Sequence, residues 1–364
     1  MHFFKSTRLI ERRTLLKAAG GAFLAGLAPR AAAALANADT VYASAFFDGD
    51  RQYGIALLTG TGEIVHRYGL PERGHDSVFD PAGRRLVTFA RRPGTFAAVI
   101  DTAKNDEPLV LHAPEDRHFY GHGRFSADGR LLYATENDFD NARGVIGVYD
   151  AAGGFRRIGE FSSGGIGPHD MAVLPGGETM LIANGGLETH PDYGRTVLNI
   201  ATMKPNLALV DLATADILAV HELPARMRKL SIRHLSMTAD GTVWFATQNQ
   251  GDIHELMPLA GSVTRDGELR LLDMADEDLR SMRGYIGSVV ANEAAGSVVF
   301  TSPQGNVAFE VEQATGAVLA RHDLADVCGA AVKDRGYFLS SGLGMLGGHK
   351  TQLAWDNHIV RRPA

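Results

Sequence analysis

A short phrase that returns six times along the chain limits its fold more than any other feature. Each copy has a polar residue at the start of a strand, a turn glycine seven or eight positions later, and then a second strand. Successive turn glycines are separated by 46, 48, 64, 55 and 40 residues, and they are Gly83, Gly129, Gly177, Gly241, Gly296 and Gly336. A repeat of about 40–50 residues with several short strands is typical of one four-stranded blade of a β-propeller.

The repeats predict an all-β fold, a seven-bladed β-propeller whose four-stranded antiparallel blades form a closed ring. Six blades begin near His75, His122, His169, His234, Ser288 and Cys328. Residues 41–70 contain three strands of a further blade whose first strand is missing. The C-terminal segment 358–362 either completes the last blade or supplies that strand, and either closure removes an exposed sheet edge. Helical periodicity is nearly absent, and residues 274–282 predict one short helix in a loop.

The first 38 residues predict a signal peptide, which leaves residues 39–364 as a single propeller domain. The leader contains the twin arginines Arg12 and Arg13 and an A-x-A cleavage site that ends at Ala38. Its apolar run of about 11 residues is too short to span a bilayer. These features favour export of a folded chain to the periplasm by the twin-arginine route. The alternative is a Sec signal with a chance arginine pair. No second apolar segment predicts stable membrane insertion after cleavage.

Charge and cysteine content exclude several classes of partner and linkage. The chain has 36 Lys and Arg against 42 Asp and Glu, and the leader holds six of the former and one of the latter. The remaining chain therefore has a net charge of −11, which disfavours nucleic acid and anionic lipid as partners. Cys328 is the single cysteine, so no intramolecular disulfide forms despite the oxidising destination.

Four of the six repeats carry histidine at the strand-start position, which points to a metal site. The course of the chain in a blade places these positions on one face of the ring, together with the loops that follow the second strands. Neutral imidazoles and a thiolate from adjacent blades can bind a transition metal such as Fe, Cu or Zn. The predicted metal ligands are His75, His122, His169, His234 and Cys328. The alternative is a structural role, in which each histidine hydrogen-bonds to a neighbouring blade.

Loops on the same face supply further candidates for ligand binding. The segment 184–205 accounts for the 64-residue repeat, and a loop that long in a compact domain is usually functional. We expect Arg195 to fold this segment over the ring face and to bring His190 and Asp192 toward the axis. Carboxylates after residue 135 lack the ordered spacing of an EF-hand. The predicted ligand-binding residues are Glu136, Asn137, Asp138, Asn184, Glu188, His190, Asp192 and Arg195.

The sequence contains no motif that identifies a catalytic residue. It lacks a nucleophile elbow, a phosphate loop, a dinucleotide fingerprint and a haem-attachment motif. We therefore favour a binding protein over an enzyme. Two alternatives stay open: a lactonase-like hydrolase or metal-dependent oxidoreductase that uses the histidine-bearing face, and a structural platform for protein interactions.

Several short motifs of the chain are also found in a known protein family, namely Gly121-His122, Gly167-Pro-His169, Ala183-Asn-Gly-Gly186, Thr189-His-Pro-Asp192 and Ser231-Ile-Arg-His234. By these motifs the chain beyond the leader resembles the domain-of-unknown-function family 1513. The resemblance implies an exported propeller related to quinoprotein amine dehydrogenase, with no established catalytic activity. It also implies a genetic setting beside imelysin-like proteins and di-haem oxidoreductases tied to iron uptake. We therefore predict a periplasmic accessory to iron or metal acquisition that binds a metal, a small ligand or an imelysin-like partner on its histidine-bearing face.

Overall fold

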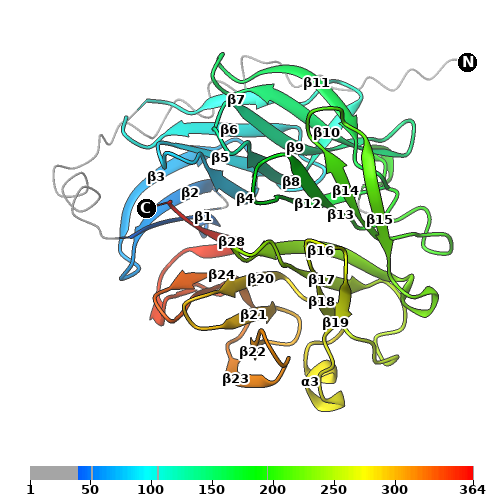
Figure 1. Ribbon diagram of the computed structural model, residues 1–364. Coiled ribbons are helices and arrows are strands. Elements are labelled where there is room, and N and C mark those ends of the chain that lie inside the picture. The colour runs from blue at the N-terminus through cyan, green and yellow to red at the C-terminus, as the bar shows by residue number, and fades with distance from the viewer. Residues whose placement is uncertain (1–39, 51, 105, 195, 364) are drawn as a thin grey trace, which may run out of the picture.

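The computed structural model describes residues 40–50, 52–104, 106–194 and 196–363. Seven sheets of four antiparallel strands form a ring, and each sheet is one blade. The innermost strands lie toward the middle of the ring and the outermost strands lie at its rim (Figure 1). This arrangement confirms the predicted seven-bladed β-propeller. The predicted signal peptide falls outside the described residues. No helix in the described part of the chain is long and apolar enough to cross a membrane.

Each blade is ordered from an innermost to an outermost strand. The innermost strands are β28 (Ala354–Arg361), β4 (Gly74–Phe79), β8 (Arg117–Phe125), β12 (Pro168–Val173), β16 (Leu230–Met237), β20 (Ser288–Asn292) and β24 (Val327–Lys333). The second strands are β1 (Val41–Phe47), β5 (Arg85–Ala90), β9 (Leu131–Asp138), β13 (Thr179–Asn184), β17 (Val243–Asn249), β21 (Ser297–Ser302) and β25 (Gly336–Ser341).

The third and outermost strands complete each blade. The third strands are β2 (Tyr53–Thr59), β6 (Phe96–Asp101), β10 (Arg143–Asp150), β14 (Asn206–Asp211), β18 (Ala260–Val263), β22 (Val307–Glu312) and β26 (Met345–Leu346). The outermost strands are β3 (Ile64–Leu70), β7 (Leu109–His112), β11 (Arg156–Ser162), β15 (Ile217–Glu222), β19 (Leu269–Leu271), β23 (Val318–Asp323) and β27 (His349–Lys350). Short helices in the described loops are η1 (Pro191–Tyr193), η2 (Ala225–Met227) and α3 (Asp276–Ser281), and α3 confirms the helix expected at 274–282.

The two ends of the described chain share one blade. Strand β28 pairs antiparallel with β1, with Tyr42 opposite Arg361 and Phe47 opposite Ala354. The C-terminal segment therefore supplies the missing innermost strand of the first blade, which is the second of the two closures considered above. This pairing closes the ring and covers the edge of β1 that would otherwise be unpaired.

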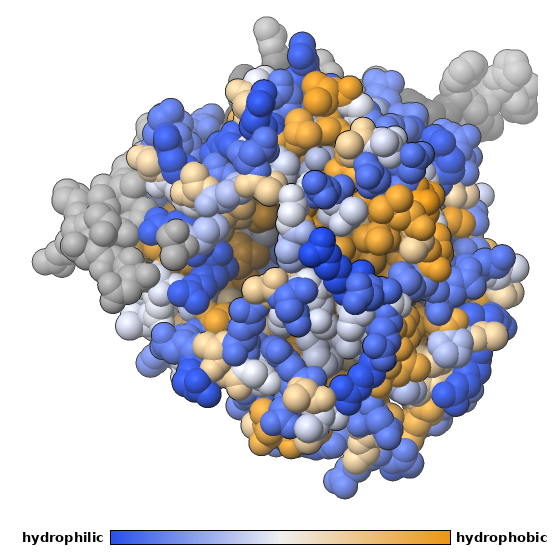
Figure 2. Space-filling model, in the orientation of Figure 1, coloured by the Kyte–Doolittle hydropathy of each residue, from blue (hydrophilic) through white to orange (hydrophobic). Residues whose placement is uncertain are grey.

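Burial follows the position of a strand within its blade. Second strands such as β5 and β13 are short apolar runs that are buried on both sides, because neighbouring blades pack against both faces of each sheet. Outermost strands alternate between exposed and partly buried residues. Strand β15 also exposes Ile217, Leu218 and Val220, and Figure 2 shows hydrophobic residues gathered over the region of β14 and β15.

Register shifts in the innermost strands position the residues at the axis. The strand pairing slips around all five histidines that occupy innermost strands, namely His75, His122, His169, His234 and His358. It also slips around Cys328, whereas the pairing of β20 is regular from Ser288 onward. A β-bulge inserts an extra residue and redirects a side chain, so these shifts let histidines at different positions along their strands point toward a common axis.

A glycine in the third blade makes room for a buried carboxylate. Glu136 is fully buried and accepts hydrogen bonds from the Tyr149 hydroxyl at 2.7 Å and from Arg157 at 2.7 Å. A Cβ atom at Gly147 would lie 1.9 Å from Glu136 Oε1. We expect Gly147→Ala to lower the free energy of unfolding by about 2 kcal/mol, because the displaced carboxylate would lose its fixed partners. Urea denaturation of both proteins measures this change.

Gly159→Ala is the matched control in the same blade. No atom lies within 4 Å of a Cβ placed at Gly159 on β11, so this variant should keep the stability of the parent protein. Equal stability of Gly147→Ala and the parent would show that Glu136 moves freely, which would contradict the close packing argued here.

Candidate metal centre

Five histidines from five innermost strands meet at the ring axis. They are His75, His122, His169, His234 and His358, and each is between 1 and 8% exposed. The ring centroids of His122 and His169 are 4.6 Å apart, and those of His234 and His358 are 4.7 Å apart. Gly121, with a φ of 105°, permits this density, since a Cβ there would lie 2.6 Å from Cδ2 of His75. The axis is therefore a packed cluster of imidazoles.

Two overlapping triads of this cluster have the spacing of a metal site. One consists of His75, His122 and His169, and the other of His122, His234 and His358. In each triad the potential ligand atoms lie within 4.8 Å of one another. Nε2 of His122, Nε2 of His358 and both ring nitrogens of His234 are buried without a hydrogen-bond partner. Because buried polar atoms are usually satisfied, this concentration of unpartnered nitrogens suggests that a ligand belongs among them.

A carboxylate on the neighbouring blade orients His122. Nδ1 of His122 lies 3.0 Å from Oδ2 of Asp76. Burial alone would raise the pKa of Asp76, but His122, His358 and Arg124 together hold this pKa well below its usual range. The ionised carboxylate accepts the Nδ1 proton of His122, which leaves Nε2 with its lone pair toward the cluster. Metal-binding histidines commonly use this carboxylate–histidine arrangement.

Nδ1 of His169 faces a hydrogen-bond donor, whereas Nδ1 of His122 faces an acceptor. A guanidinium nitrogen of Arg233 lies 3.2 Å from Nδ1 of His169. Because a guanidinium can donate but not accept, Nδ1 of His169 is the acceptor, and a neutral ring carries its proton on Nε2. His75 is intermediate, since its Nδ1 lies 3.7 Å from Oδ1 of Asp356, beyond a hydrogen bond. The triad of His122, His234 and His358 is therefore better suited to ligation than the triad that contains His169.

Burial keeps most of the cluster neutral. It lowers the pKa of His75, His169 and His234 well below the usual value, and neighbouring positive groups add to the effect. It also lowers the pKa of His358 to about 4, although Asp76 partly opposes the shift. Neutral imidazole is the form that binds metal, so these four side chains need not release a proton at neutral pH.

Cys328 lies near the axis but belongs to neither triad. Its Sγ atom is 3.3 Å from the backbone oxygen of Asp356 and 3.6 Å from that of Trp355, both on β28. Burial raises the pKa of the Cys328 thiol to about 12. The thiol is therefore protonated at neutral pH and donates to the adjacent strand.

The predicted ligand-binding residues on β9 form contacts with other protein groups. Glu136 binds Tyr149 and Arg157, and Asp138 binds Arg117, Arg143 and Asn141. Asn137 donates to Nε2 of His118 and to the backbone oxygen of Thr189, both at 2.9 Å. These side chains therefore tie strands and a loop together beside the axis.

The long loop packs against the third blade. His190 lies 3.3 Å from Oδ1 of Asp140 and contacts the ring of Phe139, whereas the side chain of Asp192 is 83% exposed. Asn184 donates to Ser163 and Asn206, and the backbone nitrogen of Glu188 donates to Asn199. Arg195 is outside the described residues, so its expected part in folding the loop stays a prediction.

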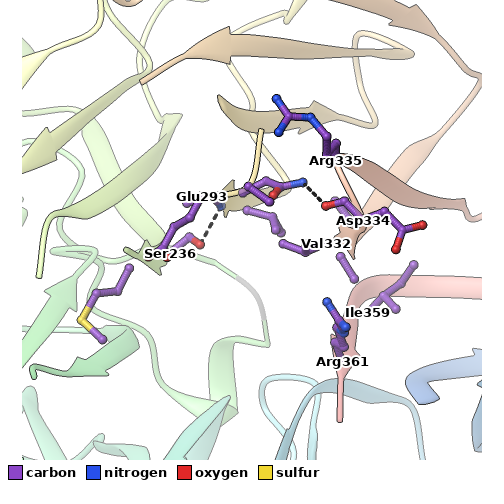
Figure 3. Close-up of a pocket in the computed structure, with 14 residues that line it drawn as sticks. Ser236, Glu293, Val332, Asp334, Arg335, Ile359 and Arg361 are labelled. Atoms are coloured by element: carbon purple, nitrogen blue, oxygen red, sulfur yellow. Dashed lines mark hydrogen bonds between the residues drawn. The ribbon is translucent and has the colours of Figure 1, made fainter. Parts of the chain in front are cut away.

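A cavity of about 750 Å³ lies at the opposite end of the innermost strands. Its wall includes Ile359, which follows His358, and Ser236, which lies two residues after His234. Arg335 and Arg361 lie at opposite ends of the group of side chains around it (Figure 3). None of the five axial histidines lines this cavity, yet it approaches the same axis from the face opposite the long loop.

The histidine that sequence reasoning missed is His358. It occupies β28, which follows the last turn glycine and carries no copy of the repeated phrase. One signal in the sequence could have identified it. The first blade lacks its first strand, and any segment that supplies this strand must lie innermost and direct a side chain at the axis.

Comparison with known proteins agrees with this architecture. A family described as "Protein of unknown function (DUF1513)" matches residues 68–362. The chain belongs to this family. The matched range contains all five axial histidines, so the whole cluster lies within the DUF1513 domain. Among curated proteins, no sequence matches this chain.

Solved structures share the fold of this DUF1513 protein at low sequence identity. A chain of Kuenenia stuttgartiensis hydrazine synthase matches with a TM-score of 0.59 and 12% identity, over 81% of this chain and 94% of that one. A chain of a nidogen/laminin complex matches with a TM-score of 0.51 and 12% identity, over 88% and 98%. At this identity the likeness extends to the propeller fold alone.

Proposed function

We propose that this protein binds one first-row transition-metal ion on the ring axis through His122, His234 and His358. The observation that supports the proposal most is the pairing of His122 Nδ1 with Asp76, which turns the lone pair of Nε2 toward two other buried rings. Imidazole ligands suit Zn, Cu, Fe and Ni. Three protein ligands also leave a coordination position open for a further group.

Energetics favour an occupied cluster. Each buried polar atom that lacks a partner costs about 1–3 kcal/mol. Nitrogens of His122, His234 and His358 are among these atoms. Coordination would satisfy one nitrogen of each ring, so metal binding offsets a cost that the folded chain otherwise bears. Structural hydrogen bonding between blades would instead leave each ring nitrogen with a protein partner.

A role in periplasmic iron or metal acquisition, beside a partner such as an imelysin-like protein, is part of the same proposal. The predicted twin-arginine leader supports it, since that route exports folded chains, often ones that already hold a cofactor. The family resemblance supports iron as the metal. Fe(II) is therefore included among the ions to be tested, with Co(II) as a spectroscopic substitute.

Titration of the metal-free protein tests the proposal. We expect one equivalent of Fe(II), Co(II), Zn(II) or Cu(II) to bind at pH 7.5, and we expect the bound ion to raise the melting temperature. At a free concentration 100 times the dissociation constant, the gain in stability is about 2.7 kcal/mol. Isothermal titration gives the stoichiometry and differential scanning calorimetry gives the melting temperature. Absence of stoichiometric binding by all four ions would refute the metal function.

A further inference from the structure

One arginine lies beside the carboxylate that orients His122. Arg124 is two residues after His122 on β8. Its guanidinium donates to Oδ2 of Asp76 at 3.1 Å and to Oδ1 of Asp170 at 2.9 Å. Asp76 lies on β4 and Asp170 on β12, which are the innermost strands that contact β8 on either side. Arg124 therefore joins three successive blades beside the histidine cluster.

Two carboxylates lie near Nδ1 of His122, but only one is close enough to accept its proton. Oδ2 of Asp76 is 3.0 Å from this nitrogen, and Oδ1 of Asp170 is 3.6 Å away, beyond a hydrogen bond. The acceptor of the Nδ1 proton fixes the orientation of the ring, and with it the direction of Nε2. The geometry of the proposed ligand therefore depends on what keeps Asp76 in place.

Asp76 and Asp170 differ in how firmly they are held. Oδ1 of Asp170 accepts from the backbone nitrogen of Met171 at 2.8 Å, and Oδ2 accepts from that of Leu235 at 3.0 Å. Apart from the ring that it orients, Arg124 is the one hydrogen-bond donor to the side chain of Asp76 among the residues that the structure describes. Asp170 thus anchors Arg124, and Arg124 anchors Asp76.

We propose that Arg124 is a positioning residue of the axial metal site, whose guanidinium holds Asp76 against Nδ1 of His122 and so directs Nε2 toward the ion. The inference rests on the proposed metal function. A guanidinium donates hydrogen bonds and has no lone pair for a metal, so Arg124 acts through Asp76 and His122 and is not itself a ligand. Groups that orient a metal-binding histidine are worth about 10–100-fold in metal affinity.

A lysine in place of Arg124 separates positioning from the effect of positive charge. The guanidinium is a planar fork that can donate to two carboxylates at once, whereas the lysine ammonium is a compact point charge. We expect Arg124→Lys to raise the dissociation constant for Co(II) about 10–100-fold, as measured by competition with a chelator. We also expect the visible absorption of bound Co(II) to change, because a turned His122 ring alters the coordination geometry.

Arg124→Gln adds a test of sign. The positive charge of Arg124 opposes the binding of a cation nearby, so removal of the charge alone would strengthen Co(II) binding. Loss of positioning would weaken it. We expect binding that is weaker by at least about tenfold, because Asp76 would lose its anchor. Stronger binding in this variant would contradict the positioning role.

Arg85→Lys is the matched control. Arg85 donates to Asp80 at 2.8 Å and to the backbone oxygens of Ala151 and Gly129 at 2.6 and 3.1 Å, so it also joins neighbouring blades. Its side chain is 29% exposed, against 28% for Arg124, and none of these contacts involves the axial cluster. We expect this variant to lower the melting temperature of the metal-free protein, as Arg124→Lys does. It should keep the Co(II) spectrum of the parent protein and an affinity within about threefold.

A purely structural role for Arg124 predicts a lower melting temperature with unchanged Co(II) affinity and spectrum, and that result would refute the inference while leaving the metal function standing. If neither Arg124 variant folds, Asp170→Asn takes their place, since asparagine keeps the size of the side chain and an oxygen for Leu235. Its weaker hold on Arg124 should change the Co(II) spectrum, and an unchanged spectrum would reject the proposal. A parent protein that binds no Co(II) would overturn the metal function and this inference together.

Discussion

Replacing His122 with alanine should lower the affinity for Co(II) at least about 100-fold. His122 belongs to both triads, and Asp76 fixes its ring at 3.0 Å with Nε2 toward the cluster. Outer groups that merely orient a metal ligand are worth 10–100-fold in affinity, so loss of a direct ligand should cost at least as much. Competition with a chelator of known affinity measures the dissociation constants of the variant and the parent protein.

His118→Ala is the matched control for this experiment. His118 lies four residues earlier on β8 and is equally buried, but it belongs to neither triad. Its Nδ1 contacts the backbone oxygen of Phe119 at 3.0 Å, and its Nε2 accepts from Asn137 at 2.9 Å. We expect His118→Ala to keep the Co(II) affinity within about threefold but to lose about 1–3 kcal/mol of stability, because the Asn137 amide would lose a buried partner.

The comparison of the two variants also decides between a binding and a structural role for the axial histidines. Equal Co(II) affinity in His122→Ala and the parent would remove the axial cluster as the metal site. Destabilisation of His122→Ala, with no metal affinity in the parent protein, would favour the structural reading, in which the rings serve blade packing.

The repeated phrase carried enough information to predict the propeller and four of the axial residues. Turn glycines fix the step between the first two strands of a blade, so the phase of each repeat also fixes which residue begins the innermost strand. That phase led to His75, His122, His169 and His234, which the structure brings together. It also led to the strands of residues 41–70 and to the need for a closing strand.

Register shifts and contacts between blades could not be predicted in the same way. The phrase puts Cys328 in an equivalent position to the histidines, yet its Sγ contacts backbone oxygens of β28. The repeated phrase does not indicate that Arg233 would meet Nδ1 of His169, because the two residues lie on different blades 64 positions apart. Roles of individual imidazoles therefore depend on packing that a linear pattern does not encode.

The acidic segment at the end of β9 shows the same limit. Its carboxylate and amide side chains were predicted to bind a ligand because of their chemical type alone. In the structure three arginines from neighbouring strands bind Glu136 and Asp138, and Asn137 donates to a histidine. These arginines are Arg117 on β8, Arg143 on β10 and Arg157 on β11. The pairing could have been predicted only with the register of all three strands.

Stability of the metal-free protein should fall steeply as the pH decreases from about 6.5 toward 4. Folded His75, His169 and His234 have pKa values well below the usual value, and that of His358 is about 4. In the unfolded chain each histidine has a pKa near 6.5. The unfolded state therefore binds more protons in this window, so the free energy of unfolding decreases as the pH falls.

The stability that depends on neutral histidines is fully present above about pH 6.5. It decreases as the pH falls toward the pKa values that these histidines have in the folded state. Each titrating group contributes about 1.4 kcal/mol per pH unit inside the window. His118 and His66, whose pKa values burial also lowers, add to the same slope. Asp76 and Asp356 have lowered pKa values, and their contribution is lost only below about pH 4, which separates the two effects. Urea denaturation at half-unit intervals between pH 7.5 and 4.5 measures the slope.

His234→Gln provides the internal control for that slope. Both ring nitrogens of His234 are buried without a hydrogen-bond partner, so the substitution removes one titrating group at little cost in contacts. The slope of the variant should be smaller than that of the parent protein by the share of one titrating group, about 1.4 kcal/mol per pH unit, because the other histidines with lowered pKa values remain. Stability that stays constant from pH 7 to 5 in the parent would mean that water or a counter-ion reaches the axial rings. In that case the buried, neutral cluster on which metal binding depends would not exist in solution.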